Sequence, residues 1–151
     1  MIRNKSMKRA TLASAIVATS AMVLSIVPAH ADSTGVTATS IKLGVSTPLT
    51  GSAGLVYGKV PGAMRAYFDY INANGGVNGR KISLVIRDDK YLPTLAATQT
   101  TNLILKDKVF ALVGALGTAT HSKAYTAAAL AKNNVPDLFI NTGFSGFTNK
   151  A

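Results

Sequence analysis

Two threonines follow a glycine in the segment Gly117-Thr118-Ala119-Thr120, at the start of a stretch that is typical of a helix. A helix N-terminus carries unpaired backbone N–H groups and a partial positive charge, which together suit a carboxylate. The hydroxyls of Thr118 and Thr120 could add hydrogen bonds to such a ligand. They could equally cap the helix with no ligand present. The residue types leave both interpretations open.

Asp88 and Asp89 form the one carboxylate pair of the sequence. A flavodoxin-like or response-regulator-like enzyme could use such a pair to hold a divalent cation. Response regulators, however, place acids after the first and third strands, where this chain has Ser46-Thr47-Pro48 and an acid-free segment at 116–121. Asp is also a frequent turn residue and helix cap. We therefore expect turn and capping roles, and keep the acidic enzyme site as an alternative.

The other enzyme motifs fail on spacing. Gly51, Gly54 and Gly58 do not form G-x-G-x-x-G, residues 54–60 lack one residue and the hydroxyl side chain of a P-loop, and residues 143–146 fall one short of G-x-S-x-G. The chain has no cysteine, which excludes thiolate nucleophiles and disulfides. Beyond residue 31 the one histidine is His121, for which we expect an exposed helix position. The sequence predicts no enzyme, no metal site and no cofactor.

The hydrophobic pattern of the elements that carry these residues alternates between two periods. Short β-branched or apolar runs predict strands at 41–47, 81–87, 109–115 and 138–140. Helices are predicted at 60–71, 93–108 and 120–132, the first ending at Asn-Gly-Gly. The β-α-β-α-β-α-β order predicts an α/β fold with a parallel, doubly wound sheet and helices on both faces. Ligands of such sheets bind beyond the carboxyl ends of the strands.

The first 31 residues have the three parts of a secretory signal peptide. Four basic residues precede an apolar run at 10–27, and Ala29-His30-Ala31 supplies the small residues that signal peptidase accepts. We predict cleavage between Ala31 and Asp32, which leaves residues 32–151 as a secreted, periplasmic or extracytoplasmic chain without a stable membrane anchor.

The formal charge of +10 includes the four basic residues of the leader. Residues 32–151 keep twelve Lys and Arg against six Asp, scattered without a basic block or an interleaved aromatic ladder. The sequence therefore predicts no nucleic-acid partner.

Four stretches of the chain together carry a family likeness. They are IKLGVSTPLTG at 41–51, NANGGVNGRK at 72–81, IRDD at 86–89 and VGALGTAT at 113–120. In order and spacing they resemble the Leu/Ile/Val-binding type (type I) of periplasmic solute-binding protein, the receptor of branched-chain amino acid ABC transporters. The resemblance implies a receptor for amino acids or similar small polar solutes that delivers them to an ABC transporter permease.

Such receptors have two lobes joined by a hinge, and the likeness covers only the first segment of lobe one. It implies that residues 32–151 are a partial N-terminal lobe and the chain an N-terminal fragment, with the second lobe and the hinge absent. An inactive remnant is a further alternative.

The resemblance also implies ligand-binding residues. Tyr57 stands where the family has a pocket-lining tyrosine, and Thr118, with Ala119 and Thr120 beside it, where a hydroxyl holds the ligand's carboxylate. Gly143 and Ser145 match a backbone carbonyl and a hydroxyl that bind its amino group. In this loop Phe144 is bulkier than the family's usual residues, which leaves the amino-acid specificity open.

Overall fold

The computed structural model describes residues 33–127 and 130–147. The predicted leader, at residues 1–31, and its cleavage site at Ala31 and Asp32 lie outside the described residues. The strands are β1 (Ser40–Thr47), β2 (Lys81–Asp88), β3 (Ala111–Val113) and β4 (Asp137–Leu138). The helices are α1 (Gly54–Tyr57), α2 (Val60–Ala73), α3 (Pro93–Leu105), α4 (Thr118–Ala127) and α5 (Leu130–Asn133), followed by the 3-10 helix η1 (Ser145–Phe147). None of the described helices is long and apolar enough to cross a membrane.

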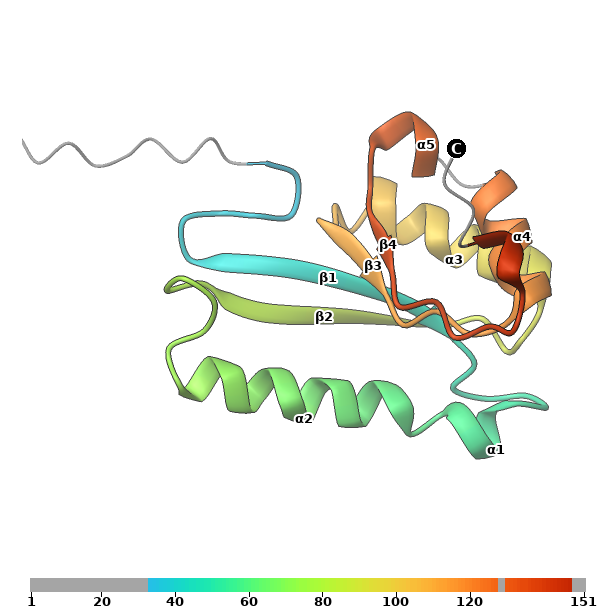
Figure 1. The fold of residues 1–151 in the computed structure, drawn as a ribbon, viewed down its shortest axis with the longest axis horizontal. Coiled ribbons are helices and arrows are strands. Elements are labelled where there is room, and N and C mark those ends of the chain that lie inside the picture. The colour runs from blue at the N-terminus through green and yellow to red at the C-terminus, as the bar shows by residue number, and fades with distance from the viewer. Residues whose placement is uncertain (1–32, 128–129, 148–151) are drawn as a thin grey trace, which may run out of the picture.

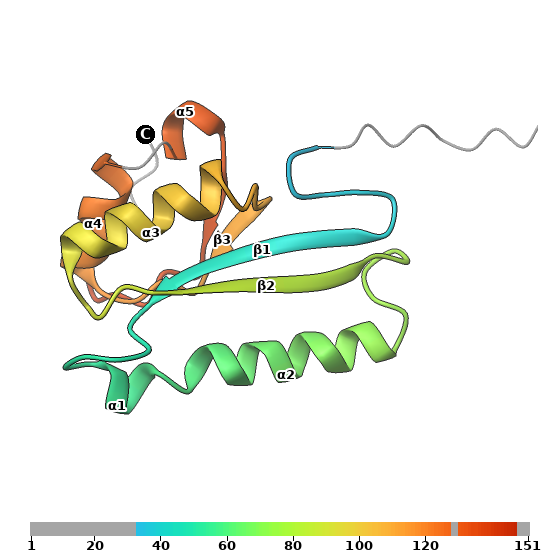
Figure 2. The ribbon, with the colours of Figure 1, turned by 180° about the vertical axis from the view of Figure 1, so that it is seen from behind.

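The four strands form one parallel sheet in the order β2-β1-β3-β4. Helix α2 covers one face of the sheet, and α3 and α4 lie on the other face (Figures 1 and 2). The chain steps from β1 to β2 in one direction and then to β3 and β4 in the other. This reversal creates a switch point at the carboxyl ends of β1 and β3, where ligands of open α/β sheets bind. The predicted parallel α/β sheet with helices on both faces is confirmed.

The two later strands are shorter than predicted. The apolar runs at 109–115 and 138–140 indicated strands, but the ladders cover only Ala111–Val113 and Asp137–Leu138. Gly114 and Phe139 have φ angles of +71° and +56°, so the chain leaves the extended conformation at these residues. Helix α1 lies between the strand predicted at 41–47 and the helix predicted at 60–71. No element was predicted there, because the glycines of this segment do not indicate so short a helix.

The turn between α2 and β2 explains the glycine-rich motif at 72–81. Gly76 has a φ of +73°, and a Cβ there would lie 2.1 Å from the carbonyl oxygen of Arg80, so only glycine fits. Asn72 then joins the helix to the strand: its Nδ2 donates to the carbonyl oxygen of Ile82, and its Oδ1 accepts from the Ile82 amide, both at 2.7 Å. The motif therefore fixes how α2 returns to the sheet.

The hydrophobic core lies between the sheet and α3. Its central cluster is Leu103, Ile104, Val109 and Leu112, with Val85 and Val135 packed against it. On the opposite face Pro61 is the buried residue of α2, while Met64, Phe68 and Ile71 are half-buried. The α3 face is thus closed and the α2 face is partly open.

Candidate ligand-binding site

The segments that follow β3 and β4 run side by side beyond the sheet. The amide of Asn141 donates to the carbonyl of Ala115 at 2.8 Å, and the amide of Gly117 donates to the carbonyl of Asn141 at 3.1 Å. These bonds extend the parallel pairing past both strands. They place the start of α4 next to the segment 141–144.

Thr118 lies where these two segments meet. It is the first residue of α4, it is exposed, and its hydroxyl is 2.6 Å from the hydroxyl of Thr142. The first backbone N–H groups of a helix lack intrahelical acceptors, and this end of the helix carries partial positive charge. Thr118 and the exposed Ala119 therefore offer a hydroxyl and a helix N-terminus on the open side of the molecule.

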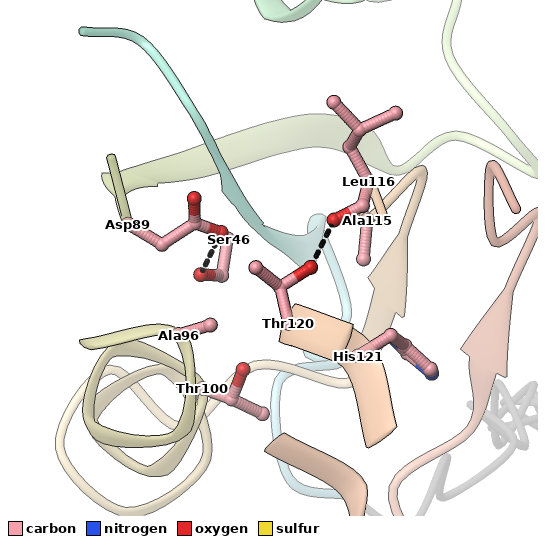
Figure 3. A pocket seen from close by; sticks show the side chains of 8 residues that line it. All are labelled: Ser46, Asp89, Ala96, Thr100, Ala115, Leu116, Thr120 and His121. Carbon is pink, nitrogen blue, oxygen red and sulfur yellow. Dashed lines mark hydrogen bonds between the residues drawn. The ribbon is translucent and has the colours of Figure 1, made fainter. Parts of the chain in front are cut away.

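Thr120 points inward instead. It is 2% exposed, and its hydroxyl donates to the carbonyl oxygen of Leu116 (Figure 3). The same hydroxyl also donates to the carbonyl oxygen of Gly117 at 3.2 Å. This bonding stabilises the first turn of α4 from inside. The structure thus separates the two threonine hydroxyls, which the sequence treated alike.

The segment after β4 brings Gly143 beside the Thr118–Thr142 contact. The amide of Phe144 donates to the hydroxyl of Thr142 at 3.2 Å, and Gly143 is exposed between them. Ser145, also exposed, begins η1. The Phe144 ring meets the Phe147 ring edge-on, with centroids 5.3 Å apart.

Tyr57 stands apart from this group. It is the last residue of α1, which lies on the α2 side of the sheet, whereas α4 lies on the other side (Figures 1 and 2). Its side chain is half-buried. The structure gathers Thr118, Ala119 and Gly143 at one place, whereas Tyr57 belongs to an element on the opposite side of the sheet.

Asp88 holds turns, as expected. Its Oδ1 accepts from the amides of Leu49, Thr50 and Lys90, and its Oδ2 accepts from the Thr50 hydroxyl at 2.6 Å. Partial burial acts to raise the pKa of Asp88, but these hydrogen bonds outweigh it and lower the pKa.

Asp89 is buried, with 1% of its surface exposed. Its carboxylate accepts from the Ser46 hydroxyl at 3.0 Å and from the amide of Tyr91 at 2.9 Å. Burial raises the pKa of Asp89 and outweighs both bonds, with the nearby charge of Asp88 adding to the rise. The predicted capping role is wrong for this pair, because Leu92 precedes α3 and that position has no side-chain cap.

His121 is a second correction. We expected an exposed helix position, but the residue is 3% exposed, and its Nε2 lies 2.9 Å from Oδ2 of Asp137. The contact is close but is not aligned as a hydrogen bond. The imidazole faces β4, which the sequence could not place beside α4.

A small cavity lies beneath the N-terminus of α4, lined by Ser46, Asp89, Ala96, Thr100, Ala115, Leu116, Thr120 and His121 (Figure 3). Its volume is about 10 Å³, close to the minimum for one water molecule. An amino acid cannot enter it. A solute at Thr118 would therefore lie on the open side of the strand ends.

Sequence reasoning missed Thr142. The residue follows the fourth predicted strand, so the rule that ligands bind at strand ends could have drawn attention to it. Its pairing with Thr118 depends on β4 lying beside β3, which the sequence does not show. Among the described residues, no group of three His, Cys, Asp or Glu side chains could hold a metal ion.

Known proteins resemble this chain in sequence and in fold. The family model described as periplasmic binding protein matches residues 40–151. An amino acid binding protein from Pseudomonas aeruginosa is 43% identical over 77 residues, which cover 49% of this chain and 20% of that protein.

Several solved structures are also similar in fold, and two of them contain a bound ligand. The branched-chain amino acid transporter substrate binding protein LivJ from Streptococcus pneumoniae, in complex with isoleucine, is 30% identical with a TM-score of 0.65; the match covers 72% of this chain and 31% of LivJ. A solute binding protein of an ABC transporter from Rhodopseudomonas palustris, in complex with 3,4-dihydroxybenzoic acid, is 26% identical with a TM-score of 0.60, over 72% and 29% of the two chains. This chain thus spans less than a third of the length of these proteins.

Proposed function

Because this chain belongs to the periplasmic binding protein family, which is a family of solute-binding receptors, we propose that it serves an ABC transporter as an extracytoplasmic receptor for small carboxylate-bearing solutes. Amino acids are the first candidates, and the branched-chain amino acids stand first among them. The chain does not act as an enzyme in this proposal, and its partners are the solute and the transporter's permease.

One observation carries the proposal: the exposed hydroxyl of Thr118 lies at the N-terminus of α4, at the switch point of the sheet. A hydroxyl and a helix N-terminus at the same place suit a carboxylate. The two ligands named for the similar structures, isoleucine and 3,4-dihydroxybenzoic acid, both carry one. The shared carboxylate supports the proposal that Thr118 binds this group. Other residues would bind the rest of the solute.

The remaining predicted residues would bind other parts of a solute whose carboxylate is bound at Thr118. The backbone of Gly143 and the hydroxyl of Ser145 would bind an amino group, since both follow Thr142, the hydroxyl partner of Thr118. Tyr57 would pack against the solute from the α1 side. Full enclosure needs more than these residues, because the cavity beneath them is about 10 Å³ and small-molecule sites span roughly 300–1,000 Å³. The second lobe that the family likeness implies would supply that cover.

Export is part of the proposal. The basic segment, the apolar run and the Ala29-His30-Ala31 site support a leader that is removed after Ala31. Mass spectrometry of the secreted chain should find Asp32 at its N-terminus. An intact leader in a membrane fraction would contradict export.

The function is tested by titrating the isotope-labelled chain with L-isoleucine, L-leucine, L-valine and 3,4-dihydroxybenzoate at millimolar concentrations. Isoleucinamide, which lacks the carboxylate, is the matched control ligand. We expect the acids to shift the amide NMR signals of Thr118 and Ala119, and isoleucinamide to leave these two signals unchanged. Equal shifts with isoleucinamide, or no shift at Thr118 with any acid, would contradict the proposal.

Thr118→Ala gives the corresponding variant test. It removes a hydrogen bond to a charged group, worth about 1.5–3 kcal/mol, so affinity should fall roughly tenfold or more. Tyr57→Ala should weaken binding to a similar degree through the lost aromatic contact. Thr98→Ala is the control, because Thr98 is exposed on α3 and its hydroxyl donates within its own helix to Thr94. Unchanged affinity in both Thr118→Ala and Tyr57→Ala would limit these residues to structural roles.

A further inference from the structure

The segment that follows β2 approaches the ligand site through Tyr91. Lys90 and Tyr91 have φ angles of +53° and +63°, a left-handed conformation that residues other than glycine adopt only where the surroundings hold them. Each of the two backbone amides donates to a carboxylate. The Lys90 amide donates to Asp88 and the Tyr91 amide to Asp89, both at 2.9 Å.

This turn places the ring of Tyr91 against Gly117. Gly117 has a φ of +97°, and a Cβ built on it would lie 2.6 Å and 3.1 Å from two ring carbons of Tyr91. The ring thus occupies the space that a side chain on Gly117 would need. It closes one side of the residue that precedes Thr118.

Gly117 is in turn tied to both sides of the site. Its amide donates to the carbonyl of Asn141, and its carbonyl accepts from the amide of His121 in the first turn of α4. A shift of Gly117 would therefore move the start of α4 relative to the segment that carries Thr142. The contact between the hydroxyls of Thr118 and Thr142 depends on that alignment.

The buried side chain of Asp89 connects this turn to the sheet. Its carboxylate joins the end of β1, through the Ser46 hydroxyl, to the left-handed turn, through the Tyr91 amide. The side chain itself lies under the site, in the wall of the small cavity (Figure 3). It does not reach the open side where a solute would bind.

We propose that Asp89 is a positioning residue of the ligand site, which holds Tyr91 against Gly117 and thereby fixes the orientation of Thr118. The inference rests on the proposed function for the meaning of Thr118. The chain of contacts from Asp89 to Tyr91 to Gly117 can be measured without any ligand.

The test compares NMR spectra of the wild-type chain with those of Asp89→Ala, Asp89→Asn, Tyr91→Ala and Ser46→Ala. A ring packed on Gly117 shifts the Gly117 Hα signals, so Tyr91→Ala should abolish this ring-current shift and move the Thr118 amide signal. Asp89→Ala should likewise abolish the ring-current shift and move the Thr118 amide signal. The double variant Asp89→Ala/Tyr91→Ala should give the same spectrum at these residues as Tyr91→Ala alone. Asp89→Asn should largely retain the shift, because its amide oxygen can still accept from Tyr91 while its NH₂ group donates to Ser46.

Ser46→Ala is the matched control, since it removes the other partner of the same carboxylate and leaves Tyr91 bound. It should leave the Gly117 and Thr118 signals close to wild type. A Ser46→Ala spectrum like that of Asp89→Ala, or an unchanged Gly117 shift in Asp89→Ala, would overturn the positioning role. If Asp89→Ala does not fold, two other results would overturn the positioning role of Asp89. These are a Gly117 ring-current shift that persists in Tyr91→Ala, and one that is lost in Asp89→Asn.

Titration with L-isoleucine then separates this inference from the proposed function. Affinity should fall in parallel in Asp89→Ala and Tyr91→Ala and stay near wild type in Asp89→Asn and Ser46→Ala. Absence of binding in every form would contradict the proposed function. The Gly117 shift would still decide whether Asp89 positions the loop.

Discussion

Asp88 and Asp89 are neighbours in the sequence with opposite electrostatic environments. The Asp88 carboxylate lies near the surface among three backbone amides and a hydroxyl, and its pKa is lowered. The Asp89 carboxylate is buried with two donors, and its pKa is raised. Asp88 ends β2 and Asp89 follows it, and side chains that alternate along an extended chain turn one acid outward and the next inward. Folding thus favours the ionised form of Asp88 and disfavours the ionised form of Asp89.

The two acids should therefore give opposite pH dependences of stability. For Asp89, the folded chain binds its proton more tightly than the unfolded chain, so stability falls as the pH rises from about 3.9, the ordinary pKa of Asp, through the raised value. Asp89→Asn should match wild type near pH 3 and unfold at higher urea concentration near pH 7. Asp88 stabilises the fold above the ordinary pKa, and this contribution is lost as the pH falls through its lowered value.

Urea unfolding of both Asn variants across this pH range provides the measurement. Asp88→Asn should lower the unfolding midpoint near neutral pH and converge with wild type in acid. A lower midpoint for Asp89→Asn than for wild type near pH 7 would show that ionised Asp89 stabilises the fold despite its burial.

Helix α2 depends on one polar side chain for its connection to the sheet. The helix has only Pro61 fully buried, so its apolar packing against β1 and β2 is modest. Asn72 compensates with two short hydrogen bonds to the backbone of Ile82, at the amino-terminal end of β2. These bonds set the angle at which the helix meets the strand.

Asn72→Ala should destabilise the chain by about 1–3 kcal/mol, because it leaves the amide and carbonyl of Ile82 without their partner. Chemical denaturation gives the free energy of unfolding. The control is Asn74→Ala, whose side chain is exposed and donates only within its own turn, to the carbonyl of Tyr70. Equal losses in the two variants would show that the Asn72 bridge adds nothing specific.

Large apolar side chains remain on the surface of several elements of the molecule. Leu55 on α1 is 92% exposed and Phe139 beyond β4 is 82% exposed. Tyr67 and Tyr70 are also exposed along α2. In addition, β4 is an edge of the sheet in the part of the chain that the structure describes. Exposed apolar patches and unpaired strand edges favour association with other chains.

We expect the isolated chain to be marginally stable and to self-associate, and to bind solutes weakly. Phe139→Asn tests the apolar contribution, because Asn accepts the left-handed φ of +56° at this position and removes the aromatic surface. Sedimentation should show a smaller average mass for this variant, with an unfolding temperature at least equal to that of wild type. Lys90→Asn is the control: it replaces an exposed residue of similar φ, +53°, without removing an exposed aromatic ring, and should leave association unchanged.

A monomeric wild-type chain with a sharp unfolding transition would contradict this expectation. If isoleucine raised the unfolding temperature of this chain, the chain would also be shown to bind isoleucine without a second lobe.

Local pattern was sufficient for the order of the strands and the longer helices and for the parallel direction of the strands. The periodicity of residues 60–71 and the β-branched runs at 41–47 and 81–87 predicted α2, β1 and β2 within two residues of their ends. These signals are local because helical and strand periods repeat over a few neighbouring side chains. The same pattern overestimated β3 and β4, where positive φ angles at Gly114 and Phe139 end the strands.

The contacts across the strand ends were decided only by the tertiary structure. The sequence placed Thr118 at a helix N-terminus, but the lateral order β2-β1-β3-β4 brings Thr142 to its hydroxyl, Tyr91 to Gly117 and Asp137 to His121. Residues far apart along the chain meet there because parallel strands align their carboxyl ends at one edge. Periodicity records which face a side chain takes, but it carries no information on which strand lies beside which.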